Sequence, residues 1–239
     1  MDVVILAGGR CEPELAEFTG VTYRAEVPYE GKTMLDIVRG ATSSLGEPII
    51  VGGPAGASTR RVEAGPSFVE SLRNGLSVVT SDNFLLTTVD LPCLTEIAVV
   101  DFISRCDFES GVNYPVIEAS ACEAKFPGMR RTTLRLKDGE FTGGNIGLVN
   151  TEAMRKLIPL LEKAYLYRKS PAKLAGLIGY GLLGRVVLSK MFPGTLSLKQ
   201  LEAKVSDSVG VCMRVVLTPF PEIGADIDNL SQYKSLINL

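Results

Sequence analysis

The sequence contains no histidine and no tryptophan, and its five cysteines are scattered without a Cys-x-x-Cys pair. The lack of histidine removes the commonest general base and the Ser-His and Cys-His nucleophile pairs. The usual ligands of a zinc site and the pattern of a disulfide framework are missing as well. Any acid–base chemistry therefore falls to carboxylates, lysine, tyrosine or a metal-bound group.

An excess of basic charge and long apolar runs are also missing. The 25 Lys and Arg residues nearly balance the 27 Asp and Glu residues, for a net charge of −2, so composition does not favour nucleic-acid binding. No apolar stretch reaches the roughly 18 residues of a membrane span, and the first residues lack the features of a signal peptide. We therefore expect a cytoplasmic protein that binds neither nucleic acid nor membrane.

The 239 residues are 46% hydrophobic, which is enough for one large α/β domain. The apolar run Val3 to Ala7 ends in Gly8 and Gly9. This pattern is typical of a buried parallel strand followed by a turn whose backbone a ligand can approach closely. A helical stripe capped by Thr33 and a second strand at 48–53 complete a β-loop-α-β unit, which predicts a parallel sheet.

The rest of the chain continues this alternation. We predict helices after Ser67 and Thr95, a hairpin around Asp138-Gly139 and a mainly helical excursion at about 151–205 within a single domain, 1–239. Further strands are predicted at 83–89, 111–117, 143–150 and 213–217. The apolar residues expected to face the core from the two predicted helices are Phe68, Val69, Leu72, Leu76 and Val79, and Ile97, Val99, Val100 and Ile103.

Aspartates follow two of the predicted strands. Asp90 comes directly after the strand at 83–89, and Asp226 and Asp228 follow the last strand. Each could equally be a turn-forming or capping residue. If the two strands are neighbours, the carboxylates converge, and Mg²⁺ prefers such oxygen ligands together with substrate phosphates. That arrangement suits an enzyme acting on nucleoside triphosphates.

Basic residues cluster at Lys125, Arg130 and Arg131, in a predicted loop before the hairpin. They are either ordinary surface residues or ligands of a phosphorylated or acidic partner. The Gly8-Gly9 pair lacks the full glycine patterns of dinucleotide-binding folds and of P-loops. Neither feature is diagnostic alone.

Taken in order, five segments of the chain resemble those of MobA-like nucleotidyltransferases. The opening turn looks like the family's L-A-G-G, and the segment around Asp90 looks like its D-x-P-x-L-T. The five segments are Ile5 to Gly9, Arg24 to Met34, Thr88 to Thr95, Thr142 to Asn145, and Gly224 to Asn229 with Tyr233.

The resemblance implies a three-layer α/β/α sandwich with a mostly parallel, mixed central sheet, as in nucleotide-diphospho-sugar transferases. It also implies transfer of a nucleoside monophosphate from an NTP to a small phosphorylated acceptor, with Mg²⁺ and release of pyrophosphate. The implied nucleotide-binding residues are Leu6, Ala7, Gly8, Gly9 and Asp90. Asp90, with Asp226 or Asp228, would hold the metal. The acceptor would meet Lys125, Arg130, Arg131 and Asn145.

The chain departs from the family after the glycine turn. Arg10 to Glu17 stands where the family has a further glycine and a catalytic arginine, and Arg24 stands where it has lysine. We take Arg10 and Arg24, with Asp90, as candidate catalytic residues. Two alternatives stay open: a non-catalytic nucleotide-binding or scaffold protein of the same fold, and a glycosyltransferase that uses Asp226-Ile227-Asp228 as its metal site. We expect the 151–205 excursion to carry acceptor specificity or a homodimer surface.

Overall fold

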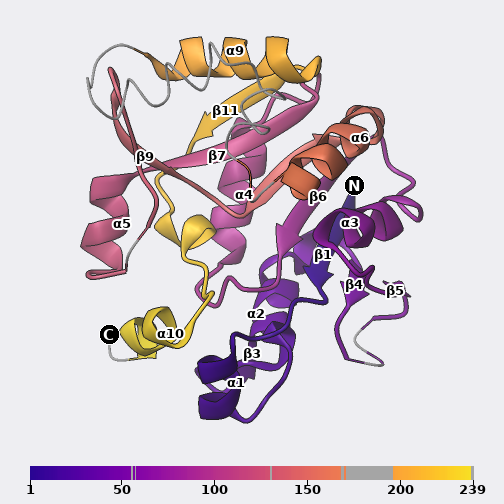
Figure 1. The fold of residues 1–239 in the computed structure, drawn as a ribbon, viewed down its shortest axis with the longest axis vertical. Coiled ribbons are helices and arrows are strands. Elements are labelled where there is room, and N and C mark those ends of the chain that lie inside the picture. The colour runs from indigo at the N-terminus through magenta and orange to yellow at the C-terminus, as the bar shows by residue number, and fades with distance from the viewer. Residues whose placement is uncertain (55, 57, 130, 168–169, 171–195, 238–239) are drawn as a thin grey trace.

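A nine-stranded sheet forms the centre of the computed structural model, which describes residues 1–54, 56, 58–129, 131–167, 170 and 196–237 (Figure 1). Its strands are β1 (Asp2–Ala7), β4 (Ile49–Gly52), β5 (Arg61–Val62), β6 (Asn83–Thr88), β7 (Val112–Glu118), β8 (Leu134–Leu136), β9 (Gly139–Gly143), β10 (Ile146–Asn150) and β11 (Met213–Leu217). A separate small ribbon pairs β2 (Pro28–Tyr29) with β3 (Lys32–Thr33).

The sheet has a parallel half and a mixed half. The strands run in the order β5-β4-β1-β6-β10-β7-β9-β8, with β11 also paired to β7. β5, β4, β1 and β6 are parallel neighbours, whereas β10 runs antiparallel to both β6 and β7. The parallel half follows from the predicted β-loop-α-β unit, because a crossover returns the chain in the same direction.

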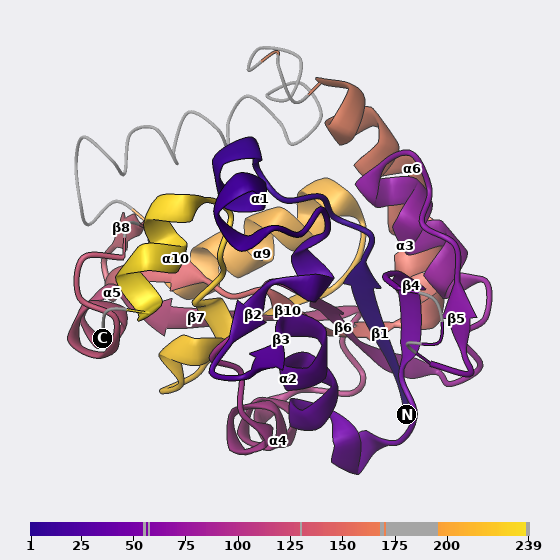
Figure 2. The ribbon, with the colours of Figure 1, turned by 90° about the horizontal axis from the view of Figure 1, so that it is seen from below.

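Helices cover both faces of this sheet, which gives the three layers expected from the sequence. In Figure 2, α2 and α4 lie below the sheet and α3 and α6 lie above it. The helices are α1 (Pro13–Thr19), α2 (Met34–Ala41), α3 (Phe68–Leu76), α4 (Glu96–Arg105), α5 (Ala119–Lys125), α6 (Thr151–Tyr167), α9 (Leu198–Val209) and α10 (Leu230–Ile237); short 3-10 turns are η1 (Arg24–Glu26), η2 (Ser43–Leu45) and η3 (Pro221–Gly224). The predicted fold class is confirmed.

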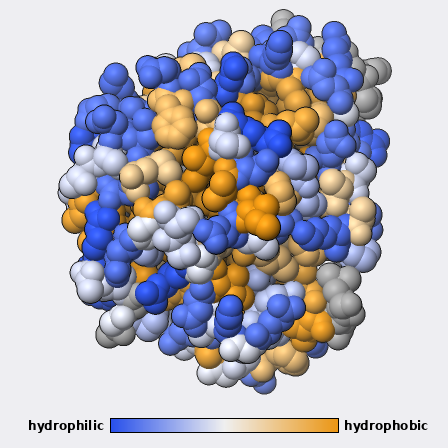
Figure 3. All heavy atoms as spheres, turned by 180° about the vertical axis from the view of Figure 1, so that it is seen from behind, coloured by the Kyte–Doolittle hydropathy of each residue, from blue (hydrophilic) through white to orange (hydrophobic). Residues whose placement is uncertain are grey.

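Three residues expected in the core lie at the surface instead. Ile97 and Val100 on α4 are 71% and 48% exposed, and Phe68 at the start of α3 is 49% exposed. Figure 3 shows such mixing on one face, where hydrophobic residues lie in small groups among hydrophilic ones. A helix buries only one stripe, and in α4 that stripe is Ala98, Val99 and Phe102. No described helix is both long enough and apolar enough to cross a membrane.

The segment between Glu12 and Thr22, for which no helix was predicted, contains α1. Glu12 caps this helix by accepting a hydrogen bond from the backbone N–H of Leu15, and Pro13 occupies its first turn. Of the 151–205 excursion, α6 and the first part of α9 are described, whereas 168–169 and 171–195 lie outside the described residues. The single-domain boundary stays a prediction.

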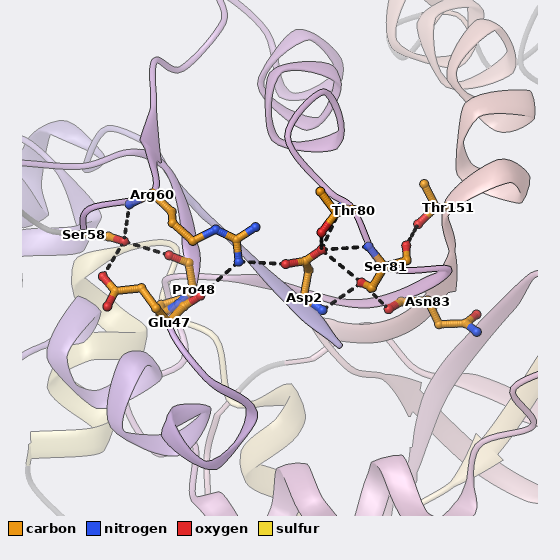
Figure 4. Close-up of polar contacts among 9 residues, drawn as sticks. All are labelled: Asp2, Glu47, Pro48, Ser58, Arg60, Thr80, Ser81, Asn83 and Thr151. Atoms are coloured by element: carbon orange, nitrogen blue, oxygen red, sulfur yellow. Dashed lines mark hydrogen bonds and ion pairs between the residues drawn. The ribbon is translucent and has the colours of Figure 1, made fainter.

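A polar network holds the first residue of β1 in place (Figure 4). Asp2 is buried and accepts hydrogen bonds from the backbone N–H groups of Thr80 and Ser81, at 2.8 and 3.0 Å. The Arg60 guanidinium lies 2.7 Å from its other oxygen. Burial alone would raise the pKa of Asp2, but these hydrogen bonds and Arg60 outweigh it and lower the pKa. The network ties the loop before β5 to the turn before β6.

Candidate active site

The carboxyl ends of β1 and β6 meet because the two strands are parallel neighbours. Leu6 pairs with Thr88, and the backbone N–H of Val89 donates to the carbonyl oxygen of Leu6 at 3.2 Å. The glycine turn and Asp90 therefore leave the sheet side by side. The backbone N–H of Ile227 donates to the carbonyl oxygen of Asp90 at 3.0 Å. This bond brings the two aspartates that flank Ile227 to the same edge.

The first glycine of the turn is required by packing within the protein. A Cβ on Gly8 would lie 2.5 Å from the Cβ of Ala64, which is closer than such atoms approach. Gly52, with φ +80°, would in turn carry its Cβ 2.6 Å from the Cα of Gly8. The loops that follow β1 and β4 are thus in close contact, and side chains at these two positions would separate them.

Arg24 links the turn to the carboxylates. Its backbone N–H donates to the carbonyl oxygen of Gly9 at 3.0 Å. Its Nη1 lies 2.5 Å from Oδ2 of Asp90 and 2.7 Å from Oδ1 of Asp228. Burial opposes the charge of the guanidinium, but the two carboxylates outweigh burial and raise its pKa. Arg24 is thus the counter-ion of both aspartates.

The third aspartate, Asp226, has a different partner. The Arg131 guanidinium lies 3.4 Å from its Oδ1 and also donates to the carbonyl oxygen of Gly143 at 3.1 Å. Burial raises the pKa of Asp226, and the negative charges of Asp90 and Asp228 add to this effect, while Arg131 opposes it. The three carboxylates therefore repel one another, with two arginines balancing them.

A cavity of about 330 Å³ opens beside this cluster, between the ends of β1 and β6 and the start of α3. Asp90 is 8% exposed, and its Oδ1 has no hydrogen-bond partner among the described residues. Nε of Arg24 and Oγ1 of Thr88 are also buried and have no hydrogen-bond partner among the described residues. The cavity is lined by Leu6, Gly8, Gly9, Arg24, Gly65, Pro66, Ser67, Phe68, Ser71, Thr88, Val89, Asp90 and Tyr165.

The donor set fits a hard divalent cation such as Mg²⁺, which takes carboxylate oxygens and substrate phosphates. Oδ1 of Asp90 is buried and unpaired, so it is available as a metal ligand. Asp228 lies close by, because the Arg24 guanidinium contacts both aspartates. Within the described residues, however, no three Cys, Asp or Glu side chains are grouped as a complete metal site. Incoming phosphate oxygens would have to complete it. The magnesium site stays a prediction.

The predicted nucleotide-binding residues divide between two faces of β1. Leu6, Gly8 and Gly9 line the cavity, while the side chain of Ala7 packs into the core on the opposite face. Arg10, predicted to be catalytic, is exposed, and its guanidinium lies over the ring of Tyr23 at 5.7 Å. Arg24, rather than Arg10, is the arginine that lines the cavity.

The predicted acceptor residues lie on the other side of the carboxylates. Nζ of Lys125 is 2.8 Å from Oε2 of Glu222, a carboxylate that is only 2% exposed. Asn145 is held through its backbone N–H, which donates to the carbonyl oxygen of Ile223 at 2.9 Å. Lys125 and Asn145 thus both meet η3. Arg131 pairs with Asp226, and Arg130 lies outside the described residues.

Several residues of the site were not foreseen. Glu222 anchors Lys125 and accepts a hydrogen bond from the Thr95 hydroxyl at 3.4 Å; an acidic residue four positions before Asp226 was its only sequence signal. Thr88, the last residue of β6, could have been found from its place at the carboxyl end of the strand, two residues before Asp90. Phe68 and Tyr165 had no signal, because only helix packing brings them to the cavity.

Several solved structures with a similar fold carry the names of transferases. No protein-family model matches the sequence, and no curated protein matches it. A nucleotidyl transferase from a Methanothermobacter species has a TM-score of 0.55 and 17% identity, covering 99% of this chain and 95% of its own. A 2-C-methyl-D-erythritol 4-phosphate cytidylyltransferase from Thermus thermophilus has a TM-score of 0.52 and 15% identity, covering 100% and 98%. These likenesses show the fold: that of the nucleotidyltransferases.

A nearer likeness shows the family. A hypothetical transferase from Thermus thermophilus is 34% identical, with a TM-score of 0.85, over 97% of this chain and 98% of that one. The chain belongs to the same transferase family as that protein.

Proposed function

We propose that this protein is an Mg²⁺-dependent nucleotidyltransferase of the MobA-like type. It transfers a nucleoside monophosphate from an NTP to a small phosphorylated acceptor and releases pyrophosphate. The observation that carries the proposal is the meeting of the glycine turn, Arg24 and the unpaired Oδ1 of Asp90 at one cavity. The names of the structural neighbours, among them a cytidylyltransferase acting on a sugar-alcohol phosphate, support the same class of reaction.

Asp90, with Asp228 or Asp226, would hold the magnesium ion. When bound, the ion would neutralise triphosphate charge that the aspartates alone would repel. The guanidinium of Arg24, already at the cavity, supplies a second positive charge with a fork geometry suited to phosphate oxygens. The backbone of Gly8 and Gly9 allows the nucleotide to lie close to the end of β1.

The acceptor would approach from the side of Arg131 and Lys125. An oxygen of its phosphate forms the new bond to the α-phosphorus of the NTP, and the bond from that phosphorus to the bridging oxygen breaks. Pyrophosphate leaves with the electron pair. Arg131, tied to Gly143 and Asp226, would orient the attacking phosphate. Such a reaction depends on positioning and charge stabilisation and needs no protein nucleophile, which suits a chain without histidine.

The test measures binding and chemistry separately. Isothermal titration with CTP, GTP, ATP and UTP, with and without Mg²⁺, should show Mg²⁺-dependent binding of at least one NTP. Asp90→Asn should abolish the Mg²⁺ dependence of NTP binding. Asp82→Asn, which removes an exposed carboxylate just before β6, should leave that dependence unchanged. Pyrophosphate release should then appear with a pool of phosphorylated sugars and alcohols. If none of the four NTPs binds, the proposal is wrong.

Two observations favour a second candidate, a nucleotide-binding protein without transferase activity. Arg24 pairs with both Asp90 and Asp228, and the segment Arg10 to Glu17 departs from the family pattern. Mg²⁺-dependent NTP binding, with no pyrophosphate released from the NTP in the presence of any acceptor in the pool, would favour this candidate. Turnover with any acceptor would exclude it.

A further inference from the structure

The hydroxyl group of Thr88 is buried in the wall of the cavity and has no partner. Its Oγ1 lacks a hydrogen bond to any described residue, although Thr88 lines the cavity beside Asp90. A buried hydroxyl without a partner destabilises a folded protein, so most such groups are satisfied. The hydroxyl of the preceding residue, Thr87, does have a partner: it donates to the carbonyl oxygen of Thr88 at 3.1 Å.

The cavity around Thr88 is lined by both charged and apolar groups. Asp90, two residues after the end of β6, lines the same cavity, with Arg24 bound to it. On the other side, Thr88 pairs across the sheet with Leu6, and Pro66 and Phe68 complete the wall. The hydroxyl thus shares one cavity with both the charged groups and the apolar ones.

A nucleoside triphosphate carries matching chemistry: charged phosphates, a sugar with hydroxyl groups, and a flat base suited to an apolar surface. With its phosphates toward Arg24 and Asp90 and its base toward Phe68, its sugar reaches Thr88. We propose that Oγ1 of Thr88 hydrogen-bonds a sugar hydroxyl of the bound nucleotide and makes the site selective for ribonucleotides. This inference rests on the proposed function and names the substrate class of the same site.

The experiment compares Thr88→Val with wild type, using whichever of CTP, GTP, ATP and UTP binds wild type most tightly, in the presence of Mg²⁺. Valine keeps the shape of threonine and removes only the hydroxyl. Thr88→Val should bind the NTP about 3- to 10-fold more weakly. The 2′-deoxy and 3′-deoxy forms of the same NTP identify the sugar hydroxyl that Thr88 contacts. Wild type and Thr88→Val should bind the form that lacks this hydroxyl with equal affinity.

Thr87→Val is the matched control, since its hydroxyl already has a partner within the chain. It should lower the Tm of the nucleotide-free protein by about 2 to 4 °C and leave NTP affinity unchanged. Thr88→Val should not lower that Tm, because no internal hydrogen bond is lost.

Three results would overturn the inference while leaving the proposed function intact. They are equal NTP affinity of Thr88→Val and wild type, an equal loss for the NTP and both deoxy forms, and a drop in Tm as large as that of Thr87→Val. Failure of wild type to bind any NTP would instead overturn the proposed function, and the inference with it.

Discussion

The guanidinium group of Arg24 lies between two carboxylates of the candidate site and balances both. The side chains of Arg24 and Asp90 are 23% and 11% exposed, so their pairing is weakly screened, while Asp228 is 54% exposed and is screened more. Losing one partner of a partly buried pair leaves the other charge without compensation. The stability of the nucleotide-free protein and its affinity for divalent ions should therefore both depend on Arg24.

Arg24→Gln should lower the free energy of unfolding by about 1 to 3 kcal/mol, because Asp90 and Asp228 then lose their shared counter-ion. Millimolar MgCl₂ should recover part of this loss in the variant and change wild type little. Urea unfolding at neutral pH, with and without MgCl₂, measures both effects.

Arg105→Gln is the control for that prediction, since it removes an exposed pair with Asp101 within α4. It should cost at most about 0.5 kcal/mol and show no response to MgCl₂. Equal losses in the two variants would contradict the role given to Arg24.

Among the elements, β1 is fixed at both of its ends. Its last residues carry the glycine turn, and its first residue, Asp2, joins the loop before β5 to the turn before β6 (Figure 4). Because β4, β1 and β6 are neighbours in the sheet, this network holds the three strands in register. The site at the far end depends on the same register.

Asp2→Asn should destabilise the protein by about 1 to 3 kcal/mol near neutral pH. The folded-state pKa of Asp2 is lowered, so its contribution is present above the ordinary aspartate value, about 3.9, and is lost as pH falls below it. The difference between wild type and Asp2→Asn should therefore shrink as pH falls below about 4. Denaturant unfolding at several pH values measures this.

The exposed carboxylate of Asp82 provides the comparison. Asp82→Asn should change stability little at any of these pH values, because no hydrogen bond of its side chain is lost. A pH-independent difference for Asp2→Asn would show that its charge is not what stabilises the network.

Helix α2 begins with a capping box that the sequence predicted. The Thr33 hydroxyl accepts from the backbone N–H of Asp36 at 3.1 Å, and the Asp36 carboxylate accepts from the backbone N–H of Thr33 at 3.3 Å. Thr33→Ala should lower the unfolding free energy by about 1 kcal/mol, and Thr33→Ser should restore most of it. The urea midpoints of the three proteins test this. A serine variant as unstable as the alanine variant would indicate that the methyl group matters instead.

For the whole molecule, ligand binding should increase the free energy of unfolding, because the carboxylates are grouped beside the cavity only in the folded state. An NTP with Mg²⁺ at a hundredfold excess over its Kd should add about 2.7 kcal/mol, raising Tm by about 5 to 10 °C. Thermal unfolding followed by circular dichroism measures the shift. Asp90→Asn should show a much smaller shift at the same concentrations, and an equal shift would remove Asp90 from the site.

The elements and the fold class follow from local sequence patterns. Unbroken apolar runs indicated the parallel strands, capping residues located the starts of α2, α3 and α4, and Asp138-Gly139 predicted the hairpin of β8 and β9. Prediction failed where local pattern does not decide burial, as at Ile97 and Val100, whose exposure depends on which stripe of α4 meets the sheet.

The charge distribution of the site, in contrast, is set by tertiary packing. Arg24 pairs with carboxylates 66 and 204 residues away, and Glu222 holds a lysine 97 residues away. Sequence identifies such groups as candidates, but ion pairs depend on separation in space, which strand order and loop packing set. For the same reason, the sequence does not show that Arg10 lies over the ring of Tyr23 whereas Arg24 reaches the aspartates. Local chemistry thus identified candidate residues, and the packing of distant segments decided which of them lie together.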